Sequence, residues 1–404
     1  MQTRMRQVAM TAATLGVLAA TIAPAPVFAQ PATAQPSAAV PPLDPELLHR
    51  AIAPVPNATV TSAQVKVSGS AGRWSGSSGR VPADGRYRIA SVTKAFTAVL
   101  ALQLVADRRL DLNQTVQHYL PGALPGAYPP ITVGQLLNHT SGLPFSLVDA
   151  ENADPRWFVA HRFDYWTPQQ VVDSAVAQPI AFAPGTEQRY NGVNYFLAGM
   201  IIEKIDRHPY AESLRRRILR PLGLHHTSLP APGEVRIPGP HARGYVTVDG
   251  SLVDVTEQSP WGWAESGIIS TNADLTRFLT ALLGGRLLPK AQLTEMVTLP
   301  NVPYTGGGGN CRIGPNPGRA CFSTGIQSTT FPNGVTVWGK SGSVPGYTTG
   351  LFATRDLSRV LTASLNPTGN RNGSETPYVQ NIAAASFDPS LFTPNQDLDE
   401  ARRR

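Results

Sequence analysis

The sequence YRIASVTKAFTAVLALQL, residues 87–104, joins a short strand-like segment to an apolar run through a serine and a lysine three residues apart. The apolar residues after Lys94 recur with the period of a buried helix. Ser91 is therefore predicted at a helix N-terminus, where free backbone N–H groups and the helix dipole stabilise negative charge. Because residues three apart share a helix face, the Lys94 amine can reach the Ser91 hydroxyl. Ser91 is thus a candidate nucleophile, with a plain helix-capping serine as the alternative.

Two short motifs farther along the chain supply the other groups that acyl transfer needs. The first is Tyr190-Asn191-Gly192, and the second is Lys340-Ser341-Gly342, which lies between a strand-like run and a turn at Pro345-Gly346. A serine with a lysine three residues later occurs by chance about once in a chain of this length, so no single motif decides the chemistry. The three motifs together predict an acyl-transfer enzyme that uses Ser91.

The first 29 residues have the pattern of a secretory signal peptide. Two arginines precede an apolar stretch over residues 8–22, and Val27-Phe28-Ala29 is a small-residue cleavage site. A membrane anchor is the alternative, but it needs roughly 20 continuous apolar residues, and Pro24 and Pro26 interrupt this stretch. We therefore expect a secreted protein with no membrane anchor.

The rest of the chain divides by composition. Residues 30–42 are rich in Pro, Ala and Gln and are predicted to be a disordered linker, and residues 391–404 a polar tail. Residues 43–390 are predicted to be one catalytic domain. Strand patterns are expected over 59–67, 72–74, 335–338, 347–353 and 360–365, and helices near 45–50, through most of 95–281, and over 378–387. The fold class is therefore α/β in α+β layers: an antiparallel sheet flanked by helices, with an all-helical lobe.

Composition and charge narrow the classes of partner. The 404 residues are 42% hydrophobic, enough for a large core. The formal net charge of +7 comes without a clustered basic face, so nucleic acid is not an expected partner. His225-His226 has no third metal ligand at a useful spacing, and we predict neither a metal site nor a cofactor. We also expect a monomer.

Cys311 and Cys321 are the only cysteines, and they bracket a short loop rich in Gly, Pro and Arg. In the oxidising compartment that the signal peptide predicts, two cysteines so close in sequence form a disulfide that closes the loop. A cysteine nucleophile would need a free thiolate beside a histidine, and nothing in the flanking residues suggests one. We interpret the pair as structural.

The chain resembles the serine β-lactamases and penicillin-binding enzymes, and within them the D-alanyl-D-alanine carboxypeptidases and class C β-lactamases. The resemblance covers most of the predicted mature chain. Besides the three motifs it includes Leu136-Leu137-Asn138-His139-Thr140-Ser141-Gly142-Leu143, Pro184-Gly185, Pro221-Leu222-Gly223-Leu224, and Ser270-Thr271 with Asp274-Leu275. In this comparison His139 belongs to a structural turn.

The resemblance implies a role for each catalytic residue. Ser91 would be acylated, Lys94 would serve as its base, and Tyr190 would relay a proton to the leaving group. A lysine is a base only when neutral, and we expect burial and the nearby charge of Lys340 to lower the pKa of Lys94. The backbone N–H groups of Ser91 and Ser343 would form the oxyanion hole.

The same resemblance implies how a substrate is held. Lys340 and Ser341, followed by Gly342, would line the edge of the cleft and bind a substrate carboxylate. Lysine in the first position of this motif is typical of the β-lactamases, whereas the carboxypeptidases that this chain resembles often have histidine there. Trp263 either walls the substrate pocket or packs in the core, and both readings stay open.

The chain departs from the family pattern at Gly192, where the family has an asparagine whose side-chain amide binds the substrate amide. Asn191 is one residue out of register and is not expected to replace it. Losing one buried hydrogen bond costs about 1 to 3 kcal/mol, so the change affects peptide or lactam affinity more than nucleophilic chemistry. An ester has no amide N–H, and Gly192 therefore favours an esterase.

Taken together, these patterns predict a secreted serine-type D-alanyl-D-alanine carboxypeptidase that acts on peptidoglycan stem peptides and binds penicillin and other β-lactams. An esterase or a class C-like β-lactamase on the same fold is the first alternative. A non-catalytic cell-wall or β-lactam-binding protein is the second, and the presence of Ser91, Lys94 and Tyr190 together argues against it.

Overall fold

The computed structural model describes residues 38–148, 154–307, 311–312 and 316–393, all within one folded unit. The predicted signal peptide, most of the predicted linker and most of the predicted tail lie outside these ranges. Within the described ranges, no helix combines the length and apolar character needed to cross a membrane.

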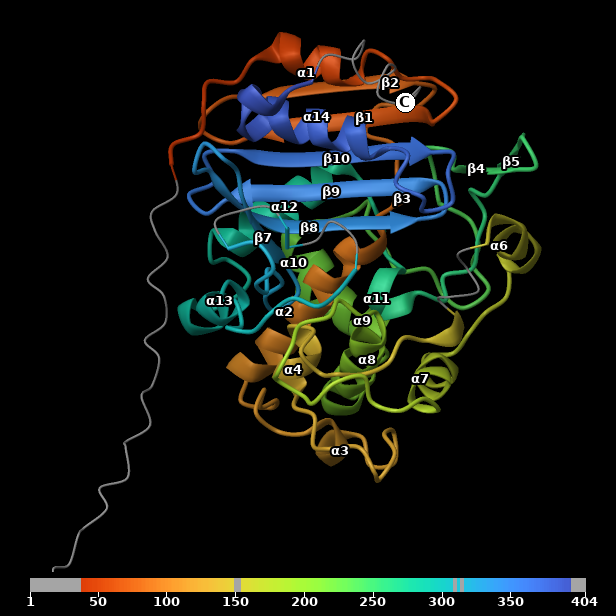
Figure 1. The fold of residues 1–404 in the computed structure, drawn as a ribbon, viewed down its shortest axis with the longest axis vertical. Helices are drawn as coiled ribbons and strands as arrows, with labels where there is room; N and C mark the ends of the chain where they lie inside the picture. Colours follow the sequence, from red (N-terminus) through yellow and green to blue (C-terminus); the bar gives the residue numbers. More distant parts are fainter. Residues whose placement is uncertain (1–37, 149–153, 308–310, 313–315, 394–404) are drawn as a thin grey trace, which may run out of the picture. The chain divides into compact units, whose positions relative to one another are not determined.

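The centre of the fold is a six-stranded antiparallel sheet with the strand order β2-β1-β10-β9-β8-β7 (Figure 1). Its strands are β1 (Val60–Ser68), β2 (Trp74–Gly79), β7 (Gln327–Thr330), β8 (Thr336–Val344), β9 (Tyr347–Thr354) and β10 (Val360–Pro367). Val65 of β1 lies opposite Ala363 of β10, so strands from the two ends of the domain meet in the middle of the sheet. The predicted sheet closed by N- and C-terminal strands is confirmed.

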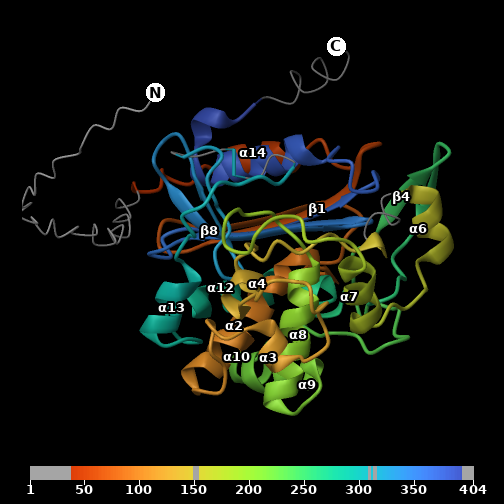
Figure 2. The ribbon, with the colours of Figure 1, turned by 60° about the horizontal axis from the view of Figure 1, so that its bottom comes forward.

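Helices cover both faces of this sheet (Figure 2). One face carries α1 (Pro45–Ile52) and α14 (Thr376–Phe387), which pack with β1 and β10 in one apolar cluster. α1 begins after Asp44, whose carboxylate accepts the backbone N–H groups of Glu46 and Leu47. The other face carries α12 (Asn272–Leu283), which contacts β1, β9 and β10 and joins the sheet to the helical lobe.

The helical lobe is organised around two long apolar helices. α2 (Thr93–Ala106) and α8 (Val193–Asp206) pack against each other. α8 also contacts α3 (Val116–Tyr119), α4 (Val133–Leu137), α7 (Pro168–Val176), α9 (Tyr210–Leu214) and α11 (Trp263–Ser266). Nearly every residue of α2 is buried, and the ring of its Phe96 stacks on Phe278 of α12 with 3.7 Å between ring centroids. The remaining α-helices among the described residues are α6 (Pro155–His161), α10 (Arg220–Leu222) and α13 (Lys290–Met296).

The structure differs from the sequence prediction in several places, and β7 (Gln327–Thr330) and α13 (Lys290–Met296) were not predicted. The second strand starts at Trp74 because Gly72, with φ +125°, belongs to the turn before it. The predicted helical middle also contains short strands: β4 (Tyr245–Val248) pairs with β5 (Ser251–Asp254), and β6 (Ile269–Ser270) pairs with β3 (Tyr87–Arg88), which belongs to the strand-like segment predicted before Ser91. Asp249 and Gly250, both with positive φ, form the tight turn between β4 and β5.

Candidate active site

Ser91 lies in a short 3₁₀ turn, Ala90–Val92, between β3 and α2. Ala90 has φ +50°, a left-handed conformation that a non-glycine residue keeps only where its surroundings enforce it. Gly342 of β8 lies directly against this turn: a β-carbon there would be 2.4 Å from the Ile89 carbonyl oxygen and 2.8 Å from the Ser91 nitrogen. The glycine of the third motif therefore lets β8 approach the nucleophile.

Lys94 is buried one helical turn after Ser91, and its Nζ lies 3.1 Å from Ser91 Oγ. The ammonium group also donates to the backbone oxygen of Glu265 at 3.2 Å and forms an ion pair with the Glu265 carboxylate. Glu265 lies in α11, and its side chain is 16% exposed. The i, i+3 spacing brings Ser91 and Lys94 together as predicted. The Glu265 carboxylate beside Lys94 comes from a distant segment and was not predicted.

Tyr190 lies between the two lysines of the motifs. Its ring centroid is 5.0 Å from Lys94 Nζ and 4.7 Å from Lys340 Nζ. The rings of His139 and Phe322 pack on it, with centroid distances of 4.5 and 4.9 Å. The Tyr190 hydroxyl is buried and makes no hydrogen bond of normal geometry to a described residue. Its environment is therefore cationic and largely shielded from water.

These charges set the protonation of the site. Burial alone would raise the pKa of Tyr190, but the ammonium groups of Lys340 and Lys94 outweigh burial and hold that pKa below its usual value. The pKa of Lys340 lies below its usual value, mainly because the side chain is buried. Tyr190 raises this pKa, but the charge of Lys94 lowers it again. Burial would also lower the pKa of Lys94, yet the Glu265 carboxylate raises it above its usual value. The predicted lowering of the Lys94 pKa was therefore wrong, because the prediction did not include Glu265.

Lys340 and Ser341 lie on β8, beside the nucleophile turn. Lys340 is 4% exposed, and its ammonium group donates to the Ser341 backbone oxygen at 2.9 Å and faces the rings of Tyr190 and Phe322. Ser341 and Ser343 are half-buried. The third motif thus contributes a buried cation behind Tyr190.

A hollow of about 190 Å³ opens in front of Ser91. Its polar wall includes Tyr190, Glu265 and Ser343, together with the cations Arg88 and Arg371. Arg88 is committed to the fold, because its guanidinium donates to the backbone oxygens of Val235, Thr256 and Gln258. Apolar side chains form the other wall: Phe145, Phe158, Pro260, Trp261, Val344 and Pro345.

Gly192 borders the same hollow at the start of α8. A β-carbon at this position would lie 3.1 Å from Glu265 Oε1 and 3.2 Å from its Cγ, so the glutamate side chain fills the space beside the glycine. The neighbouring Asn191 points elsewhere: its amide donates to the backbone oxygens of Leu143 and Pro144 at 2.8 and 3.0 Å. Asn191 therefore holds a loop and does not substitute for the family asparagine.

Trp263 lies outside the hollow and packs on α8. A β-carbon on Gly199 would come within 2.6 Å of the Trp263 ring, and the rings of Phe196 and Tyr210 lie 6.5 and 5.3 Å away from it, centroid to centroid. Trp261, two residues earlier, lines the hollow instead. Of the two readings that the sequence left open for Trp263, its position fits core packing.

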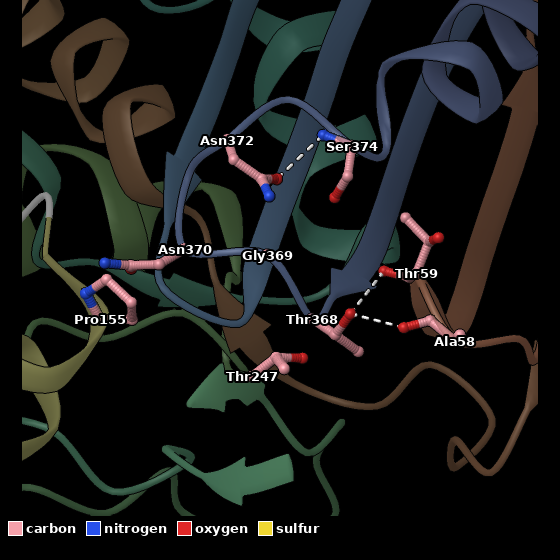
Figure 3. A pocket seen from close by; sticks show the side chains of 9 residues that line it. All are labelled: Ala58, Thr59, Pro155, Thr247, Thr368, Gly369, Asn370, Asn372 and Ser374. Carbon is pink, nitrogen blue, oxygen red and sulfur yellow. Dashed lines mark hydrogen bonds between the residues drawn. The ribbon is translucent and has the colours of Figure 1, made fainter. Parts of the chain in front are cut away.

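Arg371 lies in the loop between β10 and α14 and is exposed. It forms no salt bridge with the described residues, although its charge reaches Glu265. Its neighbours Asn370 and Asn372 line a second hollow of about 510 Å³ (Figure 3), where Asn372 Oδ1 accepts the N–H of Ser374 at 3.0 Å. The loop thus presents amides to one hollow and a guanidinium to the catalytic one.

Cys311 and Cys321 form a disulfide, and the segment after it supports Tyr190. The Gln188 side chain accepts the backbone N–H groups of Cys321 and Phe322, both at 3.1 Å, and donates to the Phe322 oxygen at 2.7 Å. These bonds fix the Phe322 ring against Tyr190. The predicted pairing of the cysteines is present, and disulfides are typical of proteins that meet an oxidising compartment.

Three site residues, Glu265, Arg371 and Trp261, were not predicted. The stretch Trp263-Ala264-Glu265-Ser266 contains a carboxylate among small and apolar residues, a weak signal for a buried acid. Its partner Lys94 is 171 residues away, and nothing local indicates the pairing. No group of three His, Cys, Asp or Glu that could hold a metal ion occurs in the part of the chain that the structure describes.

A protein-family model described as Beta-lactamase matches residues 53–385. The chain belongs to the β-lactamase family. The family predicted from the motifs is thereby confirmed, and the chain is a β-lactamase-fold member of a superfamily of serine hydrolases.

This β-lactamase-family chain is similar over most of its length to two solved amidases. A D-stereospecific amidohydrolase from Streptomyces sp. is 33% identical, with a TM-score of 0.74, covering 85% of this chain and 98% of that one. A D-amino acid amidase from Ochrobactrum anthropi SV3 is 26% identical, with a TM-score of 0.70, covering 84% and 97%.

Curated relatives within the family match over a shorter stretch. One of them, named "Putative D-alanyl-D-alanine carboxypeptidase", from Salmonella paratyphi A, is 30% identical over 148 residues, which are 35% of this chain and 33% of that protein. The chain spans about a third or less of the length of the curated relatives it matches.

Proposed function

We propose that the chain is an exported serine amidohydrolase that cleaves amide or peptide bonds whose acyl part has the D configuration. The observation that carries the chemistry is the contact of Ser91 Oγ with Lys94 Nζ at 3.1 Å, beside Tyr190, at a hollow. The D configuration is supported by the similarity to the Streptomyces amidohydrolase, which extends over nearly all of that chain. Export is supported by the disulfide.

In the proposed mechanism Tyr190 takes the serine proton. Glu265 keeps Lys94 as an ammonium, which donates to Ser91 Oγ, and the two lysine charges favour a phenolate at Tyr190. Ser91 Oγ forms a bond to the carbonyl carbon while its proton moves to Tyr190. The backbone N–H groups of Ser91 and Ser343 would stabilise the oxyanion.

Collapse of this intermediate breaks the C–N bond, and the leaving amine takes the proton from Tyr190. Water then attacks the Ser91 ester and gives a proton to Tyr190. The bond between the acyl carbon and Ser91 Oγ breaks, Tyr190 returns the proton to Oγ, and the product acid leaves. Tyr190 thus carries the proton in both steps, from Ser91 to the leaving amine in the first and from water to Ser91 in the second, and Lys94 serves as a fixed charge.

The proposal is tested by the hydrolysis of D- and L-phenylalanine amide. We expect the D substrate to have a kcat/KM at least about tenfold higher, and Ser91→Ala to lower it about 1,000-fold or more, as loss of a nucleophile does. Ser77→Ala, an exposed serine on edge strand β2, is the matched control and should leave kcat/KM unchanged. Equal rates for D and L substrates, or activity in Ser91→Ala, would contradict the proposal.

The predicted D-alanyl-D-alanine carboxypeptidase is the second candidate, and Arg371 favours it. This exposed guanidinium borders the catalytic hollow and could pair with the terminal carboxylate of a stem peptide. The carboxylate contact through Lys340 and Ser341 stays a prediction. The name of the Salmonella relative agrees with this candidate.

Two measurements separate the candidates. A carboxypeptidase should release D-alanine from an acylated peptide ending in D-Ala-D-Ala, and benzylpenicillin should give a lasting mass adduct that is absent from Ser91→Ala. An adduct that disappears as penicilloate accumulates would indicate a β-lactamase. Hydrolysis of simple esters but of no amide would favour the esterase.

A further inference from the structure

We infer that Glu265 determines specificity in this site: it fills the space that Gly192 leaves, fixes Lys94 beside Ser91, and selects substrates whose acyl part carries a free ammonium group. The inference rests on the proposed amidohydrolase function and names its substrate class, the unblocked D-aminoacyl amide. N-acylated substrates are the class that it disfavours.

The backbone at position 192 does not require a glycine. Gly192 has φ −66° and ψ −36°, which any residue adopts at a helix start. Space beside it is tight, because a β-carbon would meet three atoms of the Glu265 side chain between 3.1 and 3.3 Å, and that side chain would have to shift. The glycine and the glutamate are therefore complementary parts of one arrangement.

Glu265 completes the surroundings of Lys94. A lysine ammonium has three N–H donors. Here Ser91 Oγ, the Glu265 backbone oxygen and the Glu265 carboxylate provide three acceptors. All three donors have a partner, so the ammonium is held in one position next to the nucleophile. Its raised pKa agrees with this arrangement.

The carboxylate also changes what the hollow can bind. An asparagine side chain both donates and accepts hydrogen bonds, whereas an ionised glutamate only accepts them. The Glu265 side chain remains 16% exposed and lines the hollow after pairing with Lys94. A carbonyl oxygen of an N-acyl group would be repelled there, while an ammonium group would be bound through a charge-assisted hydrogen bond.

The test compares three amides at pH 7. They are D-phenylalanine amide, N-acetyl-D-phenylalanine amide, and 3-phenylpropanamide, which lacks the α-amino group. We expect the wild type to prefer the free amine over the other two at least about tenfold in kcat/KM, the factor expected of a hydrogen bond to a charged group. In Glu265→Gln this preference should fall about tenfold. Glu234→Gln, an exposed glutamate, is the matched control and should keep the preference.

The ratio of kcat/KM between the three amides shows whether Glu265 recognises the substrate or acts only through Lys94. If Glu265 only positions Lys94, Glu265→Gln slows all three amides equally, and the specificity claim is overturned. Gly192→Ala is a second variant: its methyl group should displace the Glu265 carboxylate and also weaken the preference. The alkaline limb of the pH profile should move to lower pH in Glu265→Gln, because the carboxylate no longer raises the pKa of Lys94.

Binding to Ser91→Ala keeps the inference independent of turnover. Calorimetry with the same three amides should show the free amine binding at least about tenfold more tightly, and this difference should disappear when Glu265→Gln is added. If the wild type cleaves no amide, the proposed function fails, while this binding difference still decides the inference. Equal binding of the three ligands would overturn it.

Discussion

The two walls of the catalytic hollow are built in different ways. On the nucleophile side, Ser91 and Lys94 are neighbours on one helix, and Gly342 lets β8 lie against them. On the side proposed to face the substrate, Gly192 and Glu265 come from two helix segments 73 residues apart, and Arg371 comes from a loop beyond the last strand. The serine and lysine are therefore placed mainly by local geometry, whereas the groups proposed to face the substrate are brought together by tertiary packing.

The largest effect should come from the nucleophile wall. Replacing Lys94 by methionine keeps most of the volume but removes the ammonium group from Ser91 and leaves the Glu265 carboxylate unpaired. We expect kcat/KM for D-phenylalanine amide to fall about 1,000-fold or more. Lys204→Met, an exposed lysine on α8, is the control. If kcat/KM falls less than tenfold in Lys94→Met, the nucleophile side does not have the larger effect on the reaction, and the comparison fails.

Tyr190→Phe should have the next largest effect. Losing a general base costs about 100-fold or more, and the pH profile should also change. Because the pKa of Tyr190 is held below its usual value, the phenolate fraction, and with it the wild-type rate, should rise as the pH rises through that pKa. The variant should lack this limb. If the rate of Tyr190→Phe rises over the same pH range as that of the wild type, another group accepts the proton.

Arg371→Gln should have the smallest effect, limited to one class of substrate. Removing this exposed cation should lower kcat/KM for substrates with a terminal carboxylate by about tenfold and leave kcat/KM for neutral amides unchanged. The measurement is the ratio of kcat/KM for a D-Ala-D-Ala peptide and for the same peptide as its C-terminal amide. An equal change for both would mean that Arg371 supports the loop rather than the substrate.

The parts of the fold that sequence predicted are those with local patterns. The Ser91 to Lys94 spacing and the strands at both ends of the domain follow from helical and alternating periodicity. The ion pair of Lys94 with Glu265 joins segments 171 residues apart, and it reverses the predicted direction of the Lys94 pKa. Trp263 and Trp261 are two residues apart, and only the packing of α11 decides which one meets the substrate. The dipeptide Asp249-Gly250 is typical of a tight hairpin turn, but the prediction of a helical region did not take it into account.

The burial of α2 on all sides has a consequence for how such an enzyme can change over time. The nucleophile is anchored by a helix that packs into the main core, so substitutions that move it also cost stability. Arg371 lies in an exposed loop, where a single replacement disturbs few contacts. Variation among descendants of this chain should therefore accumulate in the choice of substrate, while the reaction itself is inherited unchanged.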